Sequence, residues 1–297
     1  MITKTAMIAV IGRPNVGKST LVNAMVGEKI SIVSPKPQTT RYRIFGVAER
    51  GDTQLVFADT PGFHKARNKL GEYMVKVVAE SVSDVDAACL VVEPKANVGR
   101  QEELLIERIK ELGIPAVLVI NKIDTVEKEE LLPVIAAYAE RHEFDAIVPV
   151  SAKKNDGIEI LIDELKKFAA EGPQLFPDDM MTDQTERQLC AEIIREKMLM
   201  ALESEVPHGV NVEITGFKER EDGVDEIDAT IYCEKQSHKG IIIGKNGEML
   251  KKIGEAARAD MEKMIDAKVF LRTWVKVKEN WRDSGANLKS FGFSEDS

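Results

Sequence analysis

The stretch GRPNVGKS at residues 12–19 places the strongest constraint on how this 297-residue chain folds. It fits the pattern G-x-x-x-x-G-K-[ST] at every fixed position, and it lies between an apolar run and a helical stretch that begins near Lys18. In such a loop the backbone N–H groups and the helix N-terminus point at one phosphate, so a strand must lead directly into a helix. Gly12 and Gly17 let the backbone approach that phosphate closely. Lys18 can span the β- and γ-phosphate oxygens, and the Ser19 hydroxyl can ligate Mg²⁺.

Apolar strands and helices alternate from residue 6 to about residue 168. The buried strands read as TQLVFADT, DAACLVVE, PAVLVINKID and AIVPVSA, and helical spacing recurs in RQEELLIERIKELG and GIEILIDELKKFAAEG. Apolar strands of this kind, separated by helices, predict an α/β domain with a mostly parallel sheet covered on both faces. Ligands of such domains bind at the carboxyl ends of the strands.

A segment rich in proline, glycine and acidic residues, GPQLFPDD at residues 172–179, interrupts this alternation. After it the sequence predicts a long helix, two strands, two helices and a final strand, which is the order of a small α+β domain. We therefore predict a nucleotide-binding domain over residues 1–171, a linker over 172–182 and a second domain over 183–297.

Composition is that of a soluble, cytosolic protein. No apolar run approaches the roughly 20 residues of a membrane-spanning helix. The three cysteines are far apart and lie in apolar segments, which predicts reduced core thiols. The net charge of −9 conceals an asymmetry, because residues 235–289 hold 13 Lys or Arg against 7 Asp or Glu. Such a basic segment is compatible with a polyanionic partner, although a solvated charged surface would have the same composition.

Three further motifs follow strands of the first domain. DTPG at residues 59–62 places Asp59 to hold Mg²⁺ through water and Gly62 to offer its N–H to a γ-phosphate. NKID at 121–124 places a carboxylate, Asp124, to accept two hydrogen bonds from guanine. Adenine would leave that carboxylate unpaired, at a cost on the order of thousands-fold in affinity. SAK at 151–153 places the Ala152 N–H to meet the guanine O6.

In this order and spacing, the four motifs resemble the nucleotide-binding loops of translation-factor-class GTPases. The resemblance implies a switch segment at QTTR, residues 38–41, with Thr40 rather than Thr39 closing over Mg²⁺ and the γ-phosphate. It implies catalytic roles for Lys18, Thr40 and Gly62 and a metal site formed by Ser19, Thr40 and Asp59. The implied GTP-binding set is Asn15, Val16, Gly17, Lys18, Ser19, Thr20, Asp59, Gly62, Asn121, Lys122, Asp124, Ser151, Ala152 and Lys153.

One position departs from the Ras-like pattern. Phe63 stands where Ras-like proteins carry the Gln that orients the attacking water, and its side chain cannot form a hydrogen bond. A backbone group, another side chain or a cation must do that work, or hydrolysis is slow. Asn15 resembles the Asn with which potassium-dependent members of this class hold a monovalent cation, which predicts K⁺ activation. In the alternative interpretation Asn15 only supports the loop backbone.

A second glycine-lysine stretch, GIIIGKNG at residues 240–247, is not another phosphate loop of the first kind. Asn246 replaces the hydroxyl residue that follows Gly-Lys, and the first glycine is missing from its required position. It fits instead the G-x-x-G turn between two helices that is typical of KH domains, and the element order resembles the type II variant. Such a turn clamps the backbone of about four nucleotides. The predicted RNA-binding residues are Lys239, Gly244, Lys245, Asn246, Gly247, Lys251 and Lys252.

Basic and aromatic residues also alternate in RTWVKVKENWRD near the C-terminus. The cations Arg272, Lys276, Lys278 and Arg282 could contact RNA together with the two tryptophans. Trp274 occurs at strand spacing, however, and could equally belong to the core.

A P-loop GTPase domain followed by an α+β type II KH domain resembles the Era family of bacterial ribosome-assembly GTPases across nearly the whole chain. The segments PQTTR, DTPGFH and TDQTERQLCAEIIREK add to the resemblance, while Thr185 stands where the family pattern has a Pro. The resemblance implies a GTP- and Mg²⁺-dependent switch that hydrolyses GTP to GDP, binds the 3′ end of 16S rRNA and acts in maturation of the small (30S) subunit. It further implies a cytoplasmic monomer with peripheral association at the inner face of the cell membrane.

Three other functions remain open on sequence grounds. One is an ATP-dependent kinase or ATPase, which NKID opposes. Another is a GTP-regulated protein-interaction switch whose KH-like domain binds no RNA. The third is a second nucleotide site at residues 240–247, which predicts two GTP equivalents per chain where we expect one.

Overall fold

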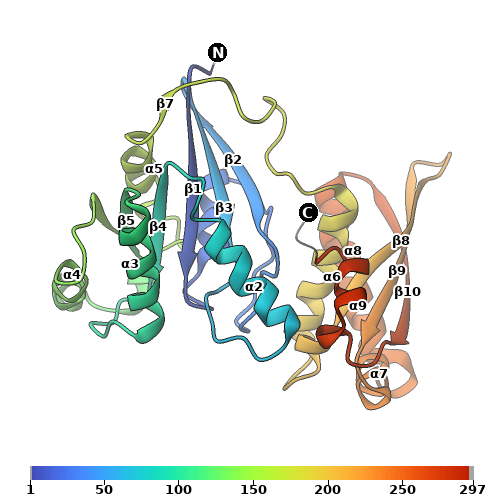
Figure 1. The fold of residues 1–297 in the computed structure, drawn as a ribbon. Coiled ribbons are helices and arrows are strands. Elements are labelled where there is room, and N and C mark those ends of the chain that lie inside the picture. The colour runs from blue at the N-terminus through green and yellow to red at the C-terminus, as the bar shows by residue number, and fades with distance from the viewer. Residues whose placement is uncertain (1, 294–297) are drawn as a thin grey trace. The chain divides into compact units, whose positions relative to one another are not determined.

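The computed structural model describes residues 2–293 and divides into two compact units (Figure 1). The first unit contains the chain up to Ser31 together with Thr40–Ala66 and Met74–Asp183. The second contains the chain from Gln184 onward and two short earlier segments, Ile32–Thr39 and Arg67–Tyr73. Both short segments fall inside the range that the sequence analysis assigned to the first domain.

The first unit is an α/β layer structure around a mostly parallel sheet, which confirms the predicted fold class. Its strands are β1 Lys4–Gly12, β2 Ile44–Arg50, β3 Thr53–Asp59, β4 Ala87–Val92, β5 Ala116–Ile120, β6 Ala146–Pro149 and β7 Ala170–Glu171. Its helices are α1 Lys18–Val26, α3 Arg100–Leu112, α4 Leu131–Ala139, α5 Ile158–Lys166 and most of α2 Lys69–Glu80. The sheet order is β2-β3-β1-β4-β5-β6, with β7 antiparallel to β1 and β2 antiparallel to β3.

Two separate apolar clusters cover the two faces of this sheet. Successive residues of β4 alternate between them: Cys89 and Val91 belong to one cluster, and Leu90 and Val92 belong to the other. Every residue of β4 and β5 is therefore buried, which explains why these strands read as continuous apolar runs. Because β1, β3, β4, β5 and β6 are parallel, their carboxyl ends meet at one edge, and the loops with the predicted nucleotide motifs follow these ends.

The segment predicted as a linker is bound along the edge strand β2. Val47 N donates to Met181 O at 2.9 Å, and Phe45 N donates to Asp183 Oδ1 at 2.9 Å. The fully buried side chain of Gln54 fixes the preceding part, since its Oε1 accepts from the backbone of Leu175 and Phe176. Its Nε2 donates back to Phe176 O at 2.8 Å. Residues 175–183 thus add backbone hydrogen bonds to the edge of the sheet.

The second unit contains a three-stranded sheet packed against helices, in the element order that the sequence predicts. Its helices are α6 Glu186–Ala201, α7 Gln236–Ile243, α8 Glu248–Ile265 and α9 Gly285–Ser290, and its strands are β8 Asn211–Glu219, β9 Val224–Cys233 and β10 Lys268–Val277. The sheet order is β10-β9-β8, with β10 parallel and β8 antiparallel to β9. α9 was not predicted.

One core unites the helices and the inner face of this sheet. It contains Ile227, Ile231 and Val275 from the strands together with Ile194 of α6 and Ile253 of α8. α6 begins at a capping box, because the Thr185 hydroxyl accepts from Gln188 N and the Gln188 side chain accepts from Thr185 N. The family departure at Thr185 therefore still gives a well-formed helix start.

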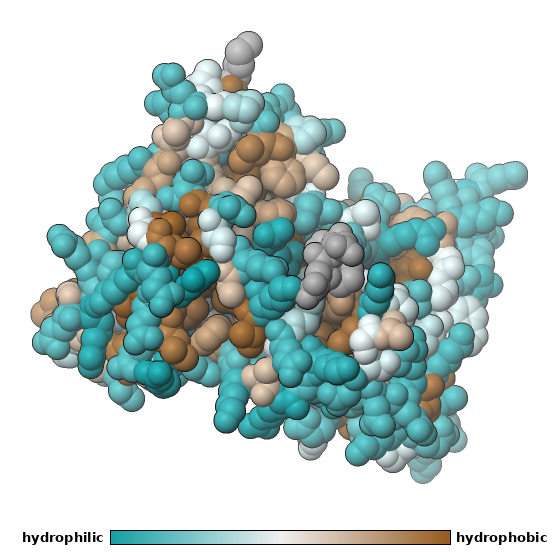
Figure 2. All heavy atoms as spheres, viewed as in Figure 1, coloured by the Kyte–Doolittle hydropathy of each residue, from teal (hydrophilic) through white to brown (hydrophobic). Residues whose placement is uncertain are grey.

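Charged side chains of α6 account for the assignment of Ile32–Thr39 to the second unit. Glu192 and Arg195 form a buried ion pair, and the Arg195 guanidinium donates to Thr39 O. Glu196 Oε1 accepts from Val33 N at 2.9 Å. The sequence analysis placed only the end of this segment, Gln38 and Thr39, in the predicted switch, and only tertiary contacts could reveal that α6 binds the segment. Hydrophilic residues dominate the surface in Figure 2, where apolar residues form smaller clusters between them.

Candidate functional site

The phosphate loop, residues 12–19, joins β1 to α1 with no room for side chains at its two glycines. A Cβ on Gly12 would lie 2.4 Å from Val91 O, and one on Gly17 would lie 2.3 Å from Asn121 Nδ2. Both glycines also have positive φ, at 154° and 98°. The loop backbone is therefore fixed by its neighbours, and α1 begins immediately after it at Lys18.

The Lys18 ammonium group lies inside this loop. The side chain is only 6% exposed, and its Nζ donates to Gly12 O at 3.2 Å and to Arg13 O at 3.0 Å. Burial lowers the pKa of Lys18 to about 8, and the nearby Asp59 carboxylate partly opposes this shift. Two carbonyl oxygens thus hold a cation where an anionic phosphate would offer a stronger partner.

Three oxygen-bearing side chains form a group that suits Mg²⁺. Asp59 is completely buried, and neither carboxylate oxygen has a well-formed hydrogen bond within residues 2–293, although nearby Ser19 and Ser31 hydroxyls lower its pKa. Burial has the larger effect and raises that pKa. Ser19 Oγ and Thr40 Oγ1 lie 2.8 Å apart. Neighbouring oxygens around an octahedral Mg²⁺ lie about 2.9 Å apart, so these residues fit the ion.

The DTPG turn packs directly on the phosphate loop. A Cβ on Gly62 would lie 2.6 Å from Pro14 Cα, so only glycine permits this approach. Phe63 N donates to Gly12 O at 3.0 Å, while the Phe63 ring packs against one of the two sheet clusters. The backbone of this turn faces the phosphate loop. The Phe63 ring, which stands where Ras-like proteins have a Gln, packs against the apolar cluster of the sheet.

The NKID and SAK loops are tied to the phosphate loop through one buried amide. Asn121 Nδ2 donates to Val16 O at 2.9 Å, and Asn121 Oδ1 accepts from Ala152 N at 3.0 Å. The Ala152 N–H, which the sequence analysis assigned to guanine O6, therefore already has a partner. A guanine oxygen would have to share or replace this bond, and the assignment stays a prediction.

Asp124 and Ser151 meet at the same edge of the sheet. The Ser151 hydroxyl donates to Asp124 Oδ1 at 2.6 Å. This hydrogen bond is the main reason that the pKa of Asp124 is lowered. The carboxylate is therefore ionised at neutral pH and oriented by its neighbour, as an acceptor of two guanine N–H groups must be.

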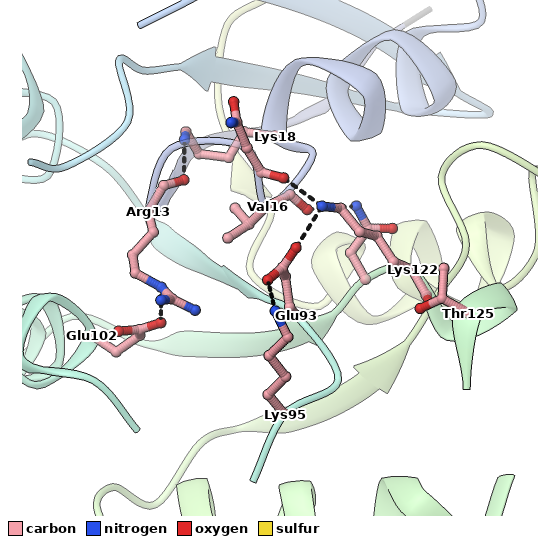
Figure 3. Close-up of polar contacts among 10 residues, drawn as sticks. Arg13, Val16, Lys18, Glu93, Lys95, Glu102, Lys122 and Thr125 are labelled. Carbon is pink, nitrogen blue, oxygen red and sulfur yellow. Dashed lines mark hydrogen bonds and ion pairs between the residues drawn. The ribbon is translucent and has the colours of Figure 1, made fainter. Parts of the chain in front are cut away.

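Two ion pairs at the phosphate loop were not predicted from the sequence (Figure 3). Lys122 Nζ lies 2.6 Å from Glu93 Oε1 and also donates to Asn15 O at 2.5 Å. On the other side of the loop, the Arg13 guanidinium pairs with the buried Glu102 of α3. Glu93 does follow a buried strand, so its position after DAACLVV was a usable signal. Glu102 offered none, because it reads as an ordinary first-turn acid of a helix.

The remaining predicted nucleotide residues lie around these loops. Val16 is buried and supplies its carbonyl to Asn121, Thr20 lies in the first turn of α1, and Lys153 is exposed just after Ala152. The structure thus brings the residues of all four motifs to one edge of the sheet. Their individual roles toward a nucleotide stay predictions.

In the second unit, the GKNG loop at residues 244–247 joins α7 to α8. Gly244 has φ 73° and ψ 177°, and a Cβ there would lie 2.7 Å from Met249 Cβ. Gly247 and Asn246 also have positive φ, but a Cβ on Gly247 would meet open space. Lys245 and Asn246 are exposed. The loop is a tight turn whose tip faces solvent.

A groove of about 500 Å³ begins at this loop. Its α8 side is lined by Gly247, Leu250, Lys251, Gly254, Glu255 and Arg258, and its other side is the edge strand β10 from Val269 to Leu271 and Thr273. Of the predicted RNA-binding lysines, Lys251 lines the groove, whereas Lys252 and Lys239 do not. Arg258 was missed, although its spacing of seven residues from Lys251 puts both on one helix face.

The structure also resolves the ambiguity of the C-terminal aromatic stretch. Trp281 is completely buried and donates from Nε1 to Gly209 O at 2.9 Å, and Arg282 pairs with Glu234. Trp274 is 46% exposed. The sequence did not show which tryptophan belongs to the core; in the structure Trp281 does, and Trp274 is half exposed.

Comparison with known proteins gives matches over both units. The family model for 50S ribosome-binding GTPases matches residues 7–122, and the KH domain model matches residues 205–282. GTPase Era from Ruminiclostridium cellulolyticum is 53% identical over 290 residues, covering 98% of this chain and 97% of the relative. GTPase Era from Caldanaerobacter subterraneus is 48% identical over 297 residues, with both chains covered completely.

Two solved structures match nearly the whole chain. One is Era in complex with MgGDPNP and nucleotides 1506–1542 of 16S ribosomal RNA, at TM-score 0.95 and 37% identity, covering 98% of this chain and 99% of that one. The other is a variant of Aquifex aeolicus Era bound to GDP and AlF₄⁻, at TM-score 0.94 and 38% identity with the same coverage.

Proposed function

The chain belongs to the Era family of GTPases, and from that premise we propose that it is a GTP-hydrolysing switch that binds 16S rRNA near its 3′ end and acts in assembly of the small ribosomal subunit. The observation that carries the proposal is the match, over nearly the full chain, to an Era structure that contains both MgGDPNP and nucleotides 1506–1542 of 16S rRNA. An unrelated nucleotide enzyme would share at most the first unit.

The nucleotide half of the proposal follows from the phosphate loop. Lys18 exchanges its two carbonyl partners for β- and γ-phosphate oxygens, and the loop N–H groups hold the same phosphates. Ser19, Thr40 and Asp59 would hold Mg²⁺, which would supply positive charge to stabilise the negative charge that develops as GDP leaves. The Gly62 N–H, fixed against Pro14, donates to the γ-phosphate.

Guanine selection rests on Asp124. The carboxylate is ionised and oriented by Ser151, so it accepts from both N–H donors of guanine. The same carboxylate faces no matching donors on adenine, which opposes the kinase or ATPase alternative. Asn121 and Lys122 keep this loop in register with the phosphate loop.

Positioning of the attacking water falls to groups other than Phe63, whose ring is packed. Activation by K⁺ through Asn15 stays a prediction. Asn15 has φ 65°, and its carbonyl accepts from Lys122, so the residue supports the loop backbone whether or not it holds a cation.

The RNA half of the proposal places the sugar-phosphate backbone at the GKNG loop and unpaired bases in the groove beside it. Gly244 and Gly247 let the loop backbone turn sharply, and exposed Lys245 and Lys251 supply charge. Arg258 extends the positive lining of the groove away from the loop.

Several narrower parts of the proposal rest on the family resemblance alone. These are association with the 30S particle, a monomeric state and peripheral association with the inner face of the cell membrane. Within residues 2–293, none of the helices combines the length and apolar character that a membrane crossing requires.

The proposal is tested by measuring the affinity for an RNA that carries the 16S 3′ end, together with the affinity for GTP and the GTP turnover with and without that RNA. Wild type is compared with a double variant, Gly244→Asp and Gly247→Asp, that puts two carboxylates at the GKNG loop. We expect RNA binding to fall by about a hundredfold or more in the variant, since the carboxylates repel phosphates and disturb the turn. GTP affinity should not change. Equal RNA affinity in the two proteins would instead support the switch whose KH-like domain binds no RNA.

A further inference from the structure

The outer face of β10 carries a stripe that the proposed function does not use. Along this strand the core-facing positions include Val269 and Val275, so the alternate positions point to the opposite face of the sheet. We define the outer stripe as Lys268, Phe270, Arg272, Trp274 and Lys276. Figure 1 shows α6 and α8 on the core side of this sheet. On the other side, Phe291 at the end of α9 packs on the outward-facing Tyr232 of β9 and under Lys278, so α9 covers that end of the outer face, while the stripe residues stay exposed. Residues 268–278 contain no acidic side chain.

Two large aromatic side chains of the outer stripe are half exposed. Phe270 is 48% and Trp274 is 46% exposed, whereas Trp281 and the apolar side chains of the inner face are buried. Isolated exposed apolar residues need no explanation, but here two aromatic residues occupy one strand face on either side of an arginine.

Arg272 is held between these rings by side chains of the neighbouring strand. Its Nε donates to Asp228 Oδ1 at 2.6 Å, and its Nη2 donates to both Asp228 Oδ2 and Glu226. The guanidinium carbon lies 5.8 Å from the Phe270 ring centroid and 6.0 Å from that of Trp274. Three planar groups therefore follow one another at two-residue intervals, about 6.6 Å per step along a strand.

As a binding surface, the outer stripe suits unstacked nucleobases better than it suits a protein partner. Every base has a π-face that stacks on aromatic rings and guanidinium planes, and the flanking Lys268 and Lys276 can contact phosphates. Asp228 and Glu226 together carry one more unit of charge than Arg272, so that residue contributes its plane, and Lys268 and Lys276 supply the positive charge for phosphates. Aromatic residues and Arg are also enriched at protein–protein interfaces, but Lys is depleted there, and the outer stripe has a Lys at both ends.

The outer stripe is also continuous with the groove. β10 is an edge strand, and its residues 269–271 and 273 line the groove beside α8. A strand of RNA that leaves the groove across this edge reaches the outer face directly. We propose that the outer stripe is a second RNA-contact site, on which bases beyond those held in the groove stack against Trp274, Arg272 and Phe270. This inference rests on the proposed RNA-binding function.

The test uses the tryptophans as reporters. In a Trp281→Phe variant, Trp274 is the sole tryptophan, and stacking of a base on its ring should quench its emission when RNA is added. Two single-stranded RNAs carrying the 16S 3′-end sequence are compared, one of four nucleotides that can fill only the groove and one of twelve. We expect quenching with the twelve-nucleotide RNA only.

Affinities in the otherwise wild-type chain give a second measurement that does not depend on the Trp281→Phe protein. Trp274→Ala should weaken binding of the longer RNA about tenfold, as expected for the loss of one stacked base. Trp274→Phe should restore most of that loss, because a ring is still present. Met200→Ala, which removes another exposed apolar side chain of the second unit, is the matched control and should have no effect.

The outcomes separate this inference from the proposed function. If Trp274→Ala leaves RNA affinity intact while the variant with Asp at positions 244 and 247 loses it, the outer stripe is not an RNA site and the proposed function stands. If Trp274→Ala loses affinity and the loop variant does not, the outer stripe stands and the role of the GKNG loop fails. If no RNA binds wild type, both fail. A Trp274 emission change with RNA-free small-subunit proteins, but none with RNA, would overturn the inference in favour of a protein partner.

Discussion

The phosphate loop and the GKNG loop share a glycine-lysine pair but place the lysine in opposite surroundings. In the phosphate loop, Lys18 is buried and hydrogen-bonded to two carbonyls. In the GKNG loop, Lys245 is exposed at the tip of a turn. A buried ammonium group suits a single anionic group that displaces its carbonyl partners, whereas an exposed one suits a chain of phosphates passing over a surface. The same two residues thus predict different ligands once burial is known.

The largest effect that would sharpen this comparison comes from Asp124→Asn. Asn keeps one acceptor oxygen but places an NH₂ donor against the second guanine N–H donor, and we expect GTP affinity to fall about a thousandfold. Isothermal titration calorimetry should show one GTP per chain in wild type and no tight site in the variant. A second GTP equivalent that persists in the variant would mean that the GKNG loop also binds a nucleotide, and the contrast between the loops would break.

A smaller effect should separate the two glycines of the GKNG loop. Gly244 has backbone angles that are essentially restricted to glycine and would place a Cβ against Met249, so Gly244→Ala should destabilise the second unit by about 2–4 kcal/mol. Gly247→Ala meets open space and should cost about 1–2 kcal/mol for its positive φ alone. Both tryptophans lie in the second unit, so the urea midpoint of tryptophan emission reports on that unit. If both variants lose the same free energy of unfolding, the structure around Met249 accommodates the added Cβ at Gly244 without cost.

The smallest predicted effect is a pH dependence that belongs to the phosphate loop alone. With a pKa of about 8, Lys18 is mostly charged at pH 7 and mostly neutral at pH 8.5 in the nucleotide-free protein. The phosphates of GTP favour the charged form of Lys18. At pH 8.5 GTP binding therefore requires the protein to take up a proton, and GTP affinity should be about fourfold lower than at pH 7. Lys245→Ala should keep this profile. A flat profile in wild type would show that Lys18 is already fully charged at pH 8.5 without nucleotide.

The loops were predictable because each is encoded by a local motif. Contacts between residues of different loops depend on the order of the strands in the sheet, and the sequence did not reveal that order. GRPNVGKS, DTPG, NKID and GKNG each encode their own backbone geometry, so the place of each loop in the order of strands and helices was correctly predicted. Glu93 and Lys122 are far apart in sequence and meet only because β4 and β5 are neighbours, with Val92 opposite Ile120. Arg258 and the groove likewise depend on how α8 packs against β10.

The predicted linker is a second case in which contacts with distant residues could not be predicted from the local sequence. Its prolines, glycine and acids correctly indicated a break in the alternation of strands and helices. They did not indicate that β2, itself absent from our strand predictions, would bind residues 175–183. Gln54 had to be recognised as a buried amide with backbone partners more than a hundred positions away.

The bound segment along β2 determines how this protein can be divided. A fragment that stops at residue 171 would remove three backbone partners of the Gln54 amide and leave water in their place, at about 0.5–1.5 kcal/mol for each hydrogen bond lost. It would also uncover the N–H groups of Phe45 and Val47 on an edge strand, which invites pairing between copies. A nucleotide-binding fragment that stays monomeric should therefore extend to Asp183. For the same reason, proteases should cut residues 175–183 slowly despite their loop-like composition.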